Sequence, residues 1–200
     1  VYDVELTEIN PLILTKDGRF FAADARLNID DNSLYRHKEI IEKLKREPAE
    51  QNEREKLATE NDMAYVELDG NIACICNGAG LTMATLDAVS IYGGEASTFL
   101  DLGGGADAER VEKGIEIALM YPKVKAILVN IMGGITRCDE VAKGILAARE
   151  DGDITAPMVI RMVGTNEEEG QEILNKAGIP FLKTMEEAAS KVVELVKEVA

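Results

Sequence analysis

The chain has 200 residues, of which 46% are hydrophobic and 30% are charged, and its formal net charge is −15. This composition is typical of a folded protein with a sizeable core, in one large domain or two small ones. The acidic excess argues against nucleic-acid binding, because a phosphate backbone requires a basic surface. No apolar run is long enough to span a bilayer.

The three cysteines, Cys74, Cys76 and Cys138, are predicted to be small core residues. Two of them lie on an expected buried strand, and an odd number does not suit a disulfide framework. This usage indicates a reduced compartment such as the cytoplasm. Val1 already lies within an expected strand, so we expect the chain to be the C-terminal part of a longer protein.

Residues 1–30 are predicted to form a β-hairpin. Residues 4–14 run out to the turn Lys16-Asp17-Gly18, and residues 19–27 run back. A three-residue loop with Gly18 in the left-handed conformation places Thr15 opposite Arg19.

The same count places Asn10 opposite Asp24, with Glu8 on the face that carries Asn10. Three oxygen-bearing side chains therefore converge on one patch, and such groups suit Mg²⁺. The alternative is an ordinary exposed polar face of a hairpin.

Residues 34–62 are highly charged and predict one or two helices, interrupted at Pro48. We interpret this segment as a surface connection with a boundary near Asn61. The sequence thus divides into residues 1–61 and residues 62–200.

Beyond that boundary, strands alternate with helices. Residues 72–76 form an apolar run that ends in Asn77-Gly78-Ala79-Gly80 and passes into an amphipathic pattern. Asp69-Gly70, just before this run, indicates a hairpin leading into the first strand. The later strands are expected at residues 98–102, 125–131, 158–163 and 179–182, and the later helices at 107–121, 138–150, 167–177 and from Thr184 onward.

Two of these helices have recognisable starts. Asn166 is a candidate N-cap, and Thr184 with Glu187 forms a capping box. The almost wholly apolar central strands predict a five-stranded parallel sheet with helices on both faces, which is a doubly wound α/β fold.

Glycines follow four of the expected strands at their carboxyl ends. Ligands bind at this edge of an open α/β sheet, and glycine lets the backbone approach them. The alternative is that the turns simply need positive φ, but clusters on several strands favour a ligand site. The N–H groups at the start of a helix suit an anion. The glycines are Gly78, Gly80, Gly103–Gly105, Gly133, Gly134 and Gly164.

The stretch from Gly133 to Asp139 combines a glycine pair with the start of a helix. The backbone N–H groups of Gly134, Ile135 and Thr136 can hold a carboxylate or a phosphate. Thr136 can also cap the helix. Arg137 is either a ligand contact or a plain ion-pair residue, and the sequence leaves both open.

Gly78-Ala79-Gly80 with Asp101 after the next strand also resembles a dinucleotide fingerprint and its ribose-binding acid. Met83, however, stands where the third glycine or alanine of that motif belongs. The single histidine, His37, lies between Arg36 and Lys38 and is interpreted as a surface residue. Without a second histidine, no Ser-His-Asp or Cys-His set can be assembled, and zinc is not expected.

Taken together, these stretches resemble the β-subunit family of succinyl-CoA synthetases, the nucleoside-diphosphate-forming succinate–CoA ligases. They occur in the family's order and cover most of the chain. The matching stretches are residues 8–12, 68–71, 77–80, 93–95, 99–105, 129–139 and 161–170.

The resemblance implies a flavodoxin-like CoA-ligase domain over residues 62–200, preceded by a hairpin and helices from the end of an ATP-grasp domain over residues 1–61. It implies that Asn10 and Asp24 are Mg²⁺ ligands and that Glu8 contacts a phosphohistidine.

The resemblance also assigns roles at the glycine-rich edge. Asn77 and the run Gly134, Ile135 and Thr136 match the family's contacts to its acid substrate. The helix that follows Gly78 and Gly80 is similar to one whose N-terminus faces the phosphohistidine.

The implied reaction converts succinyl-CoA, phosphate and ADP or GDP into succinate, CoA and ATP or GTP. It passes through an acyl phosphate and a phosphohistidine. The histidine and the CoA site belong to an α subunit, in a heterodimer or heterotetramer of the cytoplasm or mitochondrial matrix. The alternatives are a dinucleotide-binding Rossmann-like domain and a non-catalytic assembly module.

Overall fold

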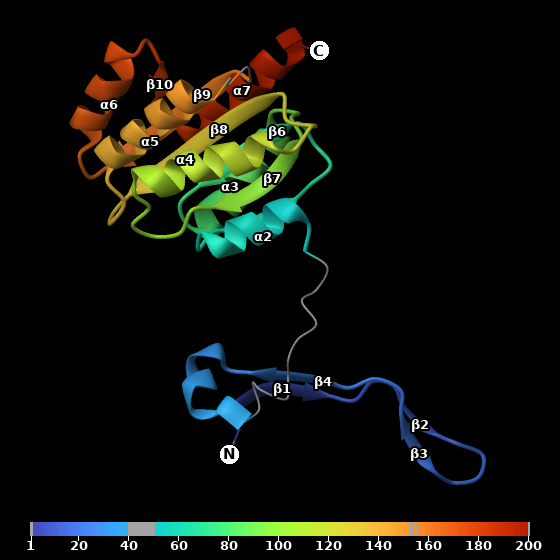
Figure 1. Cartoon of the computed structure of the whole chain (residues 1–200). Coiled ribbons are helices and arrows are strands. Elements are labelled where there is room, and N and C mark those ends of the chain that lie inside the picture. The colour runs from blue at the N-terminus through green and yellow to red at the C-terminus, as the bar shows by residue number, and fades with distance from the viewer. Residues whose placement is uncertain (1, 40–50, 153, 155, 200) are drawn as a thin grey trace. The chain divides into compact units, whose positions relative to one another are not determined.

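The computed structural model describes residues 2–39, 51–152, 154 and 156–199 (Figure 1). The chain separates into two compact units, Val1–Glu50 and Gln51–Ala200. The predicted break at Pro48 lies outside the described residues. Each unit is considered by itself.

The first unit is a long antiparallel hairpin. Strand β1 (Val4–Glu8) pairs with β4 (Arg26–Ile29), and β2 (Leu12–Leu14) pairs with β3 (Phe20–Ala22). The 3-10 helix η1 (Asp31–Arg36) follows.

The predicted turn and register are confirmed. Gly18 has φ +82°, and the Thr15 N–H donates to the Arg19 carbonyl at 2.9 Å. Glu8 lies opposite Arg26, so the register predicted from the turn also holds beyond Asn10. The turn geometry alone is sufficient to set this register.

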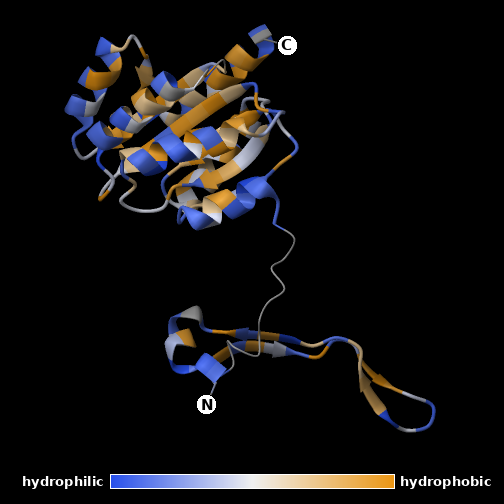
Figure 2. Ribbon diagram, viewed as in Figure 1, coloured by the Kyte–Doolittle hydropathy of each residue, from blue (hydrophilic) through white to orange (hydrophobic). Residues whose placement is uncertain are grey.

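Large apolar side chains of the hairpin are exposed. Leu14, Phe20 and Phe21 are 62%, 72% and 65% exposed, and every described residue of β1, β2 and β3 is exposed. The hydrophobic colouring of these strands is visible in Figure 2. Patches of this kind on a folded protein usually mark a contact with further protein surface.

The interpretation of His37 as a surface residue is wrong. Its side chain is only 11% exposed, and its Nε2 lies 2.6 Å from Asp3 Oδ2. Arg36 Nε donates to the same oxygen at 2.8 Å. These hydrogen bonds from Arg36 and His37 lower the pKa of the Asp3 carboxyl to about 2. The turn of η1 returns the chain to the first strand, and this long-range pairing has no local signal.

The second unit is a six-stranded sheet with the order β10-β9-β8-β6-β7-β5. Its neighbouring strands are parallel, except that β5 runs antiparallel to β7. The five parallel strands follow the doubly wound order of flavodoxin-like folds, so the predicted fold class is confirmed. The strands are β5 (Ala64–Glu67), β6 (Ile72–Cys76), β7 (Ala96–Asp101), β8 (Ala126–Gly133), β9 (Met158–Gly164) and β10 (Phe181–Leu182).

Helices cover both faces of this sheet (Figure 1). One core cluster joins the sheet to α4, α5 and α6, and a second joins it to α3 and α7. Thr184 and Glu187 form the predicted capping box of α7, with bonds of 3.3 and 3.2 Å. The helices are α3 (Ala79–Ile91), α4 (Ala108–Leu119), α5 (Cys138–Asp151), α6 (Glu167–Lys176) and α7 (Met185–Val199).

The second unit begins at Gln51, whereas the sequence places the boundary near Asn61. Helix α2 (Glu53–Glu60) is held against the sheet by Arg54, whose Nη2 donates to both carboxylate oxygens of Glu67 at 3.0 and 2.9 Å. The Arg54 guanidinium also lies 5.2 Å from the centre of the Tyr121 ring.

The hairpin predicted from Asp69-Gly70 is wrong. Strand β6 has β7 on one side and β8 on the other, so β5 cannot pair with it. The connection instead lies against the start of β7, where the Gly70 N–H donates to the Ala96 carbonyl at 3.0 Å. A Cβ at Gly70 would lie 2.2 Å from the Glu95 carbonyl oxygen, so the glycine permits this contact.

The prediction that the cysteines are core residues is confirmed, because Cys74, Cys76 and Cys138 are all buried free thiols. Burial raises the pKa of Cys76 and of Cys138 to about 11. Within the described residues, no helix combines the length and the apolarity that crossing a bilayer requires.

Candidate functional site

The candidate site lies at the carboxyl edge of β6 and β8. These strands are neighbours, but β6 leads into α3 on one face of the sheet and β8 leads into α5 on the other. The two connections therefore diverge at the topological switch point of the sheet, where open α/β folds bind ligands, and we call this place the crevice. Asn77 follows β6 at this point, and Gly134 follows β8.

Asn77 joins the two sides of the crevice. Its Nδ2 donates to the Met132 carbonyl at 2.9 Å and to Thr136 Oγ1 at 3.2 Å. Its Oδ1 accepts from the Met132 N–H at 2.8 Å. Both N–H bonds of the Asn77 amide are thus used within the protein, which fixes the distance between the two turns.

Thr136 is buried and connects a third turn. Besides the bond from Asn77, its Oγ1 accepts from the Gly105 N–H at 3.0 Å. The prediction that Thr136 caps α5 is therefore wrong, and Arg137 occupies the N-cap position without a side-chain cap bond. The hydroxyl instead binds the Asn77 side chain and the Gly105 N–H, which belong to the turns after β6 and β7.

The loop after β8 offers fewer free N–H groups than predicted. The Gly134 N–H donates to the Met132 carbonyl at 3.2 Å. Ile135 is 85% exposed, and its N–H has no acceptor among the described residues. Thr165 holds the loop from the next turn, since its N–H and Oγ1 donate to the carbonyls of Gly133 and Gly134 at 2.9 and 2.8 Å.

The N-terminus of α3 faces the same crevice edge. Gly78 has φ +109° and occupies the N-cap without a side-chain bond, and the first turn contains no acidic residue. The first hydrogen bond across this end runs from the Thr82 N–H to the Gly78 carbonyl. The first-turn amides, including that of Gly80, therefore lack intrahelical acceptors, which favours an anion there.

Asp101 is the residue whose role the sequence missed. Its Oδ1 accepts from the N–H of Gly78 and, at 2.8 Å, from that of Gly103. The carboxylate links the turns after β6 and β7 rather than pointing to a ribose. The bond from Gly103 is a local turn contact, but only the strand order brings Gly78 to the same carboxylate, so no local signal could have revealed that second bond.

The ion-pair alternative for Arg137 is the one seen. Its Nε and Nη2 lie 3.1 and 2.9 Å from the two oxygens of Asp139. Asn166 Nδ2 donates to Asp139 Oδ1 at 3.1 Å. Asn166 occupies the N-cap of α6 as predicted, with φ +57°, but its side chain makes no cap bond.

This arrangement predicts how stability depends on pH. Hydrogen bonding to Arg137 and then Asn166 lowers the pKa of Asp139 to about 2 from its usual 3.8. A lowered carboxyl pKa stabilises the fold above about pH 4, and the contribution is lost as pH falls toward 2. We expect Asp139→Asn to lower the free energy of unfolding by about 1–2 kcal/mol at pH 7.

The measurement is urea unfolding of wild type and variant between pH 7 and pH 2. The difference between the two should shrink across the interval from about pH 4 to about pH 2. Asp69→Asn removes an exposed carboxylate that pairs with Lys123 and serves as the control. A difference that does not change with pH would contradict the assignment.

In the first unit, the structure brings together two of the three predicted oxygen ligands. Asn10 Nδ2 donates to Glu8 Oε1 at 3.0 Å. Asp24 Oδ1 accepts from the Ala25 N–H at 2.8 Å and has no bond to either of the others. All three side chains are exposed, so the carbonyl oxygen of Asn10 and the second oxygen of Asp24 face solvent.

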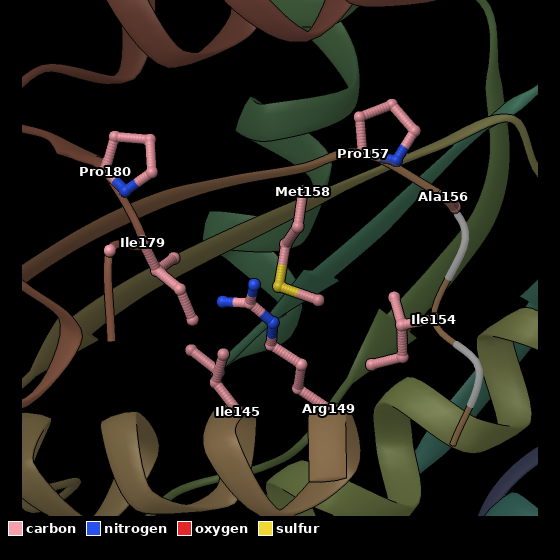
Figure 3. A pocket seen from close by; sticks show the side chains of 9 residues that line it. Ile145, Arg149, Ile154, Ala156, Pro157, Met158, Ile179 and Pro180 are labelled. Atoms are coloured by element: carbon pink, nitrogen blue, oxygen red, sulfur yellow. The ribbon is translucent and has the colours of Figure 1, made fainter.

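A cavity of about 300 Å³ lies at the opposite, amino edge of the sheet. Figure 3 shows the Arg149 guanidinium among the side chains of Ile145, Met158 and Ile179. Arg149 Nη1 donates to the Ala177 carbonyl at 3.2 Å. This cavity is therefore separate from the glycine turns at the carboxyl edge.

A family model described as CoA-ligase matches residues 75–195. The chain belongs to the CoA-ligase family. The matched segment contains the end of β6, all of β8 and the turns that follow both strands, so family membership and site geometry concern the same part of the chain.

The chain is also similar to curated relatives named succinate–CoA ligase [ADP-forming] subunit beta. The relative from Desulfurococcus amylolyticus is 52% identical over 198 residues, which are 99% of this chain and 52% of the relative. The relative from Herminiimonas arsenicoxydans is 51% identical over 193 residues, with coverages of 96% and 49%. These relatives confirm the resemblance, and the chain spans about half of their length.

Among solved structures, ATP citrate lyase from Methanosaeta concilii has a TM-score of 0.76 at 19% identity. The likeness covers 96% of this chain and 56% of that one. At this identity it confirms the fold alone. The dinucleotide alternative is left without support, because Asp101 is bonded to two turns and Met83 is 61% exposed at the missing glycine position.

Proposed function

We propose that this CoA-ligase chain is part of a succinate–CoA ligase β subunit. Together with an α subunit, it interconverts succinyl-CoA, phosphate and ADP with succinate, CoA and ATP. The observation that carries the proposal is the bridge from Asn77 to Met132 and Thr136. This bridge sets the α3 N-terminus beside an exposed glycine loop, in a chain about half identical to such subunits.

The proposed chemistry needs two adjacent anion sites. Phosphate oxygen attacks the thioester carbonyl, the CoA thiolate leaves, and an acyl phosphate forms. A histidine nitrogen then attacks the phosphorus and releases the carboxylate, and ADP takes the phosphoryl group from that nitrogen. The free N–H groups in the first turn of α3, including that of Gly80, lie where they can stabilise the phosphoryl group through the helix dipole. Gly78, whose own N–H is bonded to Asp101, forms the N-cap of this helix.

The second anion is the acid itself. We propose that its carboxylate lies at Gly134, Ile135 and Thr136, where the free N–H of Ile135 supplies a donor. We propose that the Asn77 amide gives up its bond to Thr136 and donates to the substrate carboxylate instead. The bond to Thr136 is the longer of its two donor bonds and is therefore the easier to exchange. A hydrogen bond to a charged acceptor is stronger than one to a hydroxyl, which favours the exchange.

The histidine that carries the phosphoryl group, and the CoA site, are proposed to belong to the α subunit. The single histidine of this chain, His37, is bound to Asp3 and is mostly buried. The partner would form an αβ or α2β2 assembly with this subunit.

The hairpin fits a Mg²⁺ ion for the nucleotide. Asn10 and Asp24 lie between two paired segments whose registers place them opposite each other. Both residues are exposed and can present hard oxygens to an ion, as Mg²⁺ requires. Bound there, the ion would supply charge neutralisation for phosphate oxygens. Glu8, which holds Asn10 through its amide, is proposed to contact the phosphohistidine. The exposed apolar strands of the hairpin are consistent with the end of an ATP-grasp domain.

The test is to reconstitute the full-length subunit with its α partner. We expect nucleotide formation that depends on succinyl-CoA, phosphate and ADP, with a phosphorylated α subunit as intermediate. An assembly that forms but shows neither turnover nor phosphorylation would favour the non-catalytic module instead.

A further inference from the structure

A polar layer crosses the sheet one row below the candidate site. Cys76, Asn130 and Arg161 are register partners on β6, β8 and β9. Register partners in a parallel sheet share a face, and this is the face covered by α3 and α7. The register partners two residues earlier on that face, Cys74, Leu128 and Val159, are apolar. Apolar packing alone therefore does not explain the amide and guanidinium groups in this layer.

Hydrogen bonds run continuously along this layer. Asn130 is fully buried, and its Nδ2 donates to Thr85 Oγ1 at 2.7 Å. The Thr85 hydroxyl donates to the Leu81 carbonyl at 2.7 Å, within the first turns of α3. Arg161 Nη1 donates to Asn130 Oδ1 at 3.2 Å. The layer thus links the guanidinium to the helix whose N-terminus borders the crevice.

The charge of Arg161 is not neutralised within the described part of the chain. Its remaining bonds go to the carbonyls of Lys183 at 3.3 Å and Ile131 at 3.5 Å, and it forms no ion pair there. By contrast, Arg137 and Arg54 each face a carboxylate. A half-buried arginine that meets only neutral acceptors leaves a positive potential at this edge.

We infer that Arg161 is a positioning residue for the anion at the carboxyl edge. Held by Asn130 and the Lys183 carbonyl, it acts by its charge and not by direct contact. Its positive charge locally offsets the negative charge of the chain, −15 in total, at the place where the phosphate or phosphoryl group binds. This inference rests on the proposed function, because that function supplies the anion.

The test compares Arg161→Gln, Arg161→Lys and Arg149→Gln in the reconstituted full-length assembly. A unit charge on the order of 10 Å from an anion at a protein surface is worth about ten-fold in affinity. Arg161→Gln should therefore raise the KM for inorganic phosphate about ten-fold and flatten its dependence on ionic strength. Arg161→Lys keeps the charge and should stay within about three-fold of wild type. Arg149→Gln removes a charge at the opposite edge and should leave the KM unchanged.

A purely structural role predicts a different pattern. Arg161→Lys and Arg161→Gln would then lower the melting temperature by the same amount, and both would keep the wild-type KM for phosphate. That pattern would overturn the inference. Equal KM values for Arg161→Gln and Arg149→Gln, or failure of both Arg161 variants to fold, would also overturn it.

A second measurement separates this inference from the proposed function. The rise in melting temperature caused by inorganic phosphate, relative to sodium chloride of equal ionic strength, reports anion binding without turnover. If wild type lacks the ligase activity but Arg161→Gln alone loses this rise, the proposed function fails and the inference stands. If turnover is present and the rise is the same in all variants, the inference fails.

Discussion

Gly164→Ala is expected to lower the free energy of unfolding by more than about 3 kcal/mol. Gly164 has φ +119°, and a Cβ there would lie 2.1 Å from the Gly133 carbonyl oxygen and 2.7 Å from its carbon. The contact is with backbone, so no side-chain rotation relieves it. The turns after β8 and β9 must separate, which also breaks the bond from the Thr165 N–H to the Gly133 carbonyl.

Gly134→Ala provides the matched control on the same pair of turns. A Cβ at Gly134 meets nothing within 4 Å, and its φ is not positive, so stability should change by no more than about 0.5 kcal/mol. Urea unfolding with matched m-values gives both numbers. A Gly164→Ala variant within about 1 kcal/mol of wild type would show that the two turns are not in close contact.

Gly164 and Gly134 also show which features of the turns can be predicted from the sequence and which cannot. A glycine at the end of each strand can be located from the apolar run before it. The spacing does not reveal that Gly164 must lack a Cβ while Gly134 tolerates one. That distinction depends on which turns are neighbours, and therefore on the strand order.

The same limit separates the confirmed predictions from the wrong ones. The hairpin register followed from one turn, because Gly18 fixes the loop and the loop fixes the pairing. The strand that pairs with β5 could not be predicted in this way, because Asp69-Gly70 is equally compatible with a hairpin and with a connection that crosses to another strand. Thr136 was predicted as a cap from local sequence, but partners from other turns bind its hydroxyl. Asn166 does occupy the predicted N-cap of α6, but its side chain binds Asp139.

The proximity of Asn77 to the loop after Gly133 was predictable, but the contacts that these residues make were not. The resemblance placed Asn77 and the loop after Gly133 at one site, and the strand order does bring them together. It did not indicate that the Asn77 amide is fully bonded within the protein. Charge complementarity at the crevice also involves Arg161, which is visible only once β8 and β9 are paired.

Asn77→Ala is expected to reduce kcat/KM of the reconstituted assembly by at least about 100-fold. The change removes three hydrogen bonds that fix the loop after β8 relative to the start of α3. The two anion sites then lose their relative position, and small displacements of reacting groups cost rate steeply. The stability loss should be modest, about 1–3 kcal/mol, because Asn77 is only half-buried.

Asn77→Asp sharpens this prediction. It keeps the size of the side chain but places an oxygen against the Met132 carbonyl, and it adds a negative charge beside the proposed anion. Activity should therefore fall at least as far as in Asn77→Ala. Asn61→Ala, which loses an amide bonded within its own helix to the Leu57 carbonyl at 2.8 Å, should keep wild-type turnover. Full turnover by a folded Asn77→Ala assembly would mean that the acid and the phosphoryl group are not held across the crevice between β6 and β8.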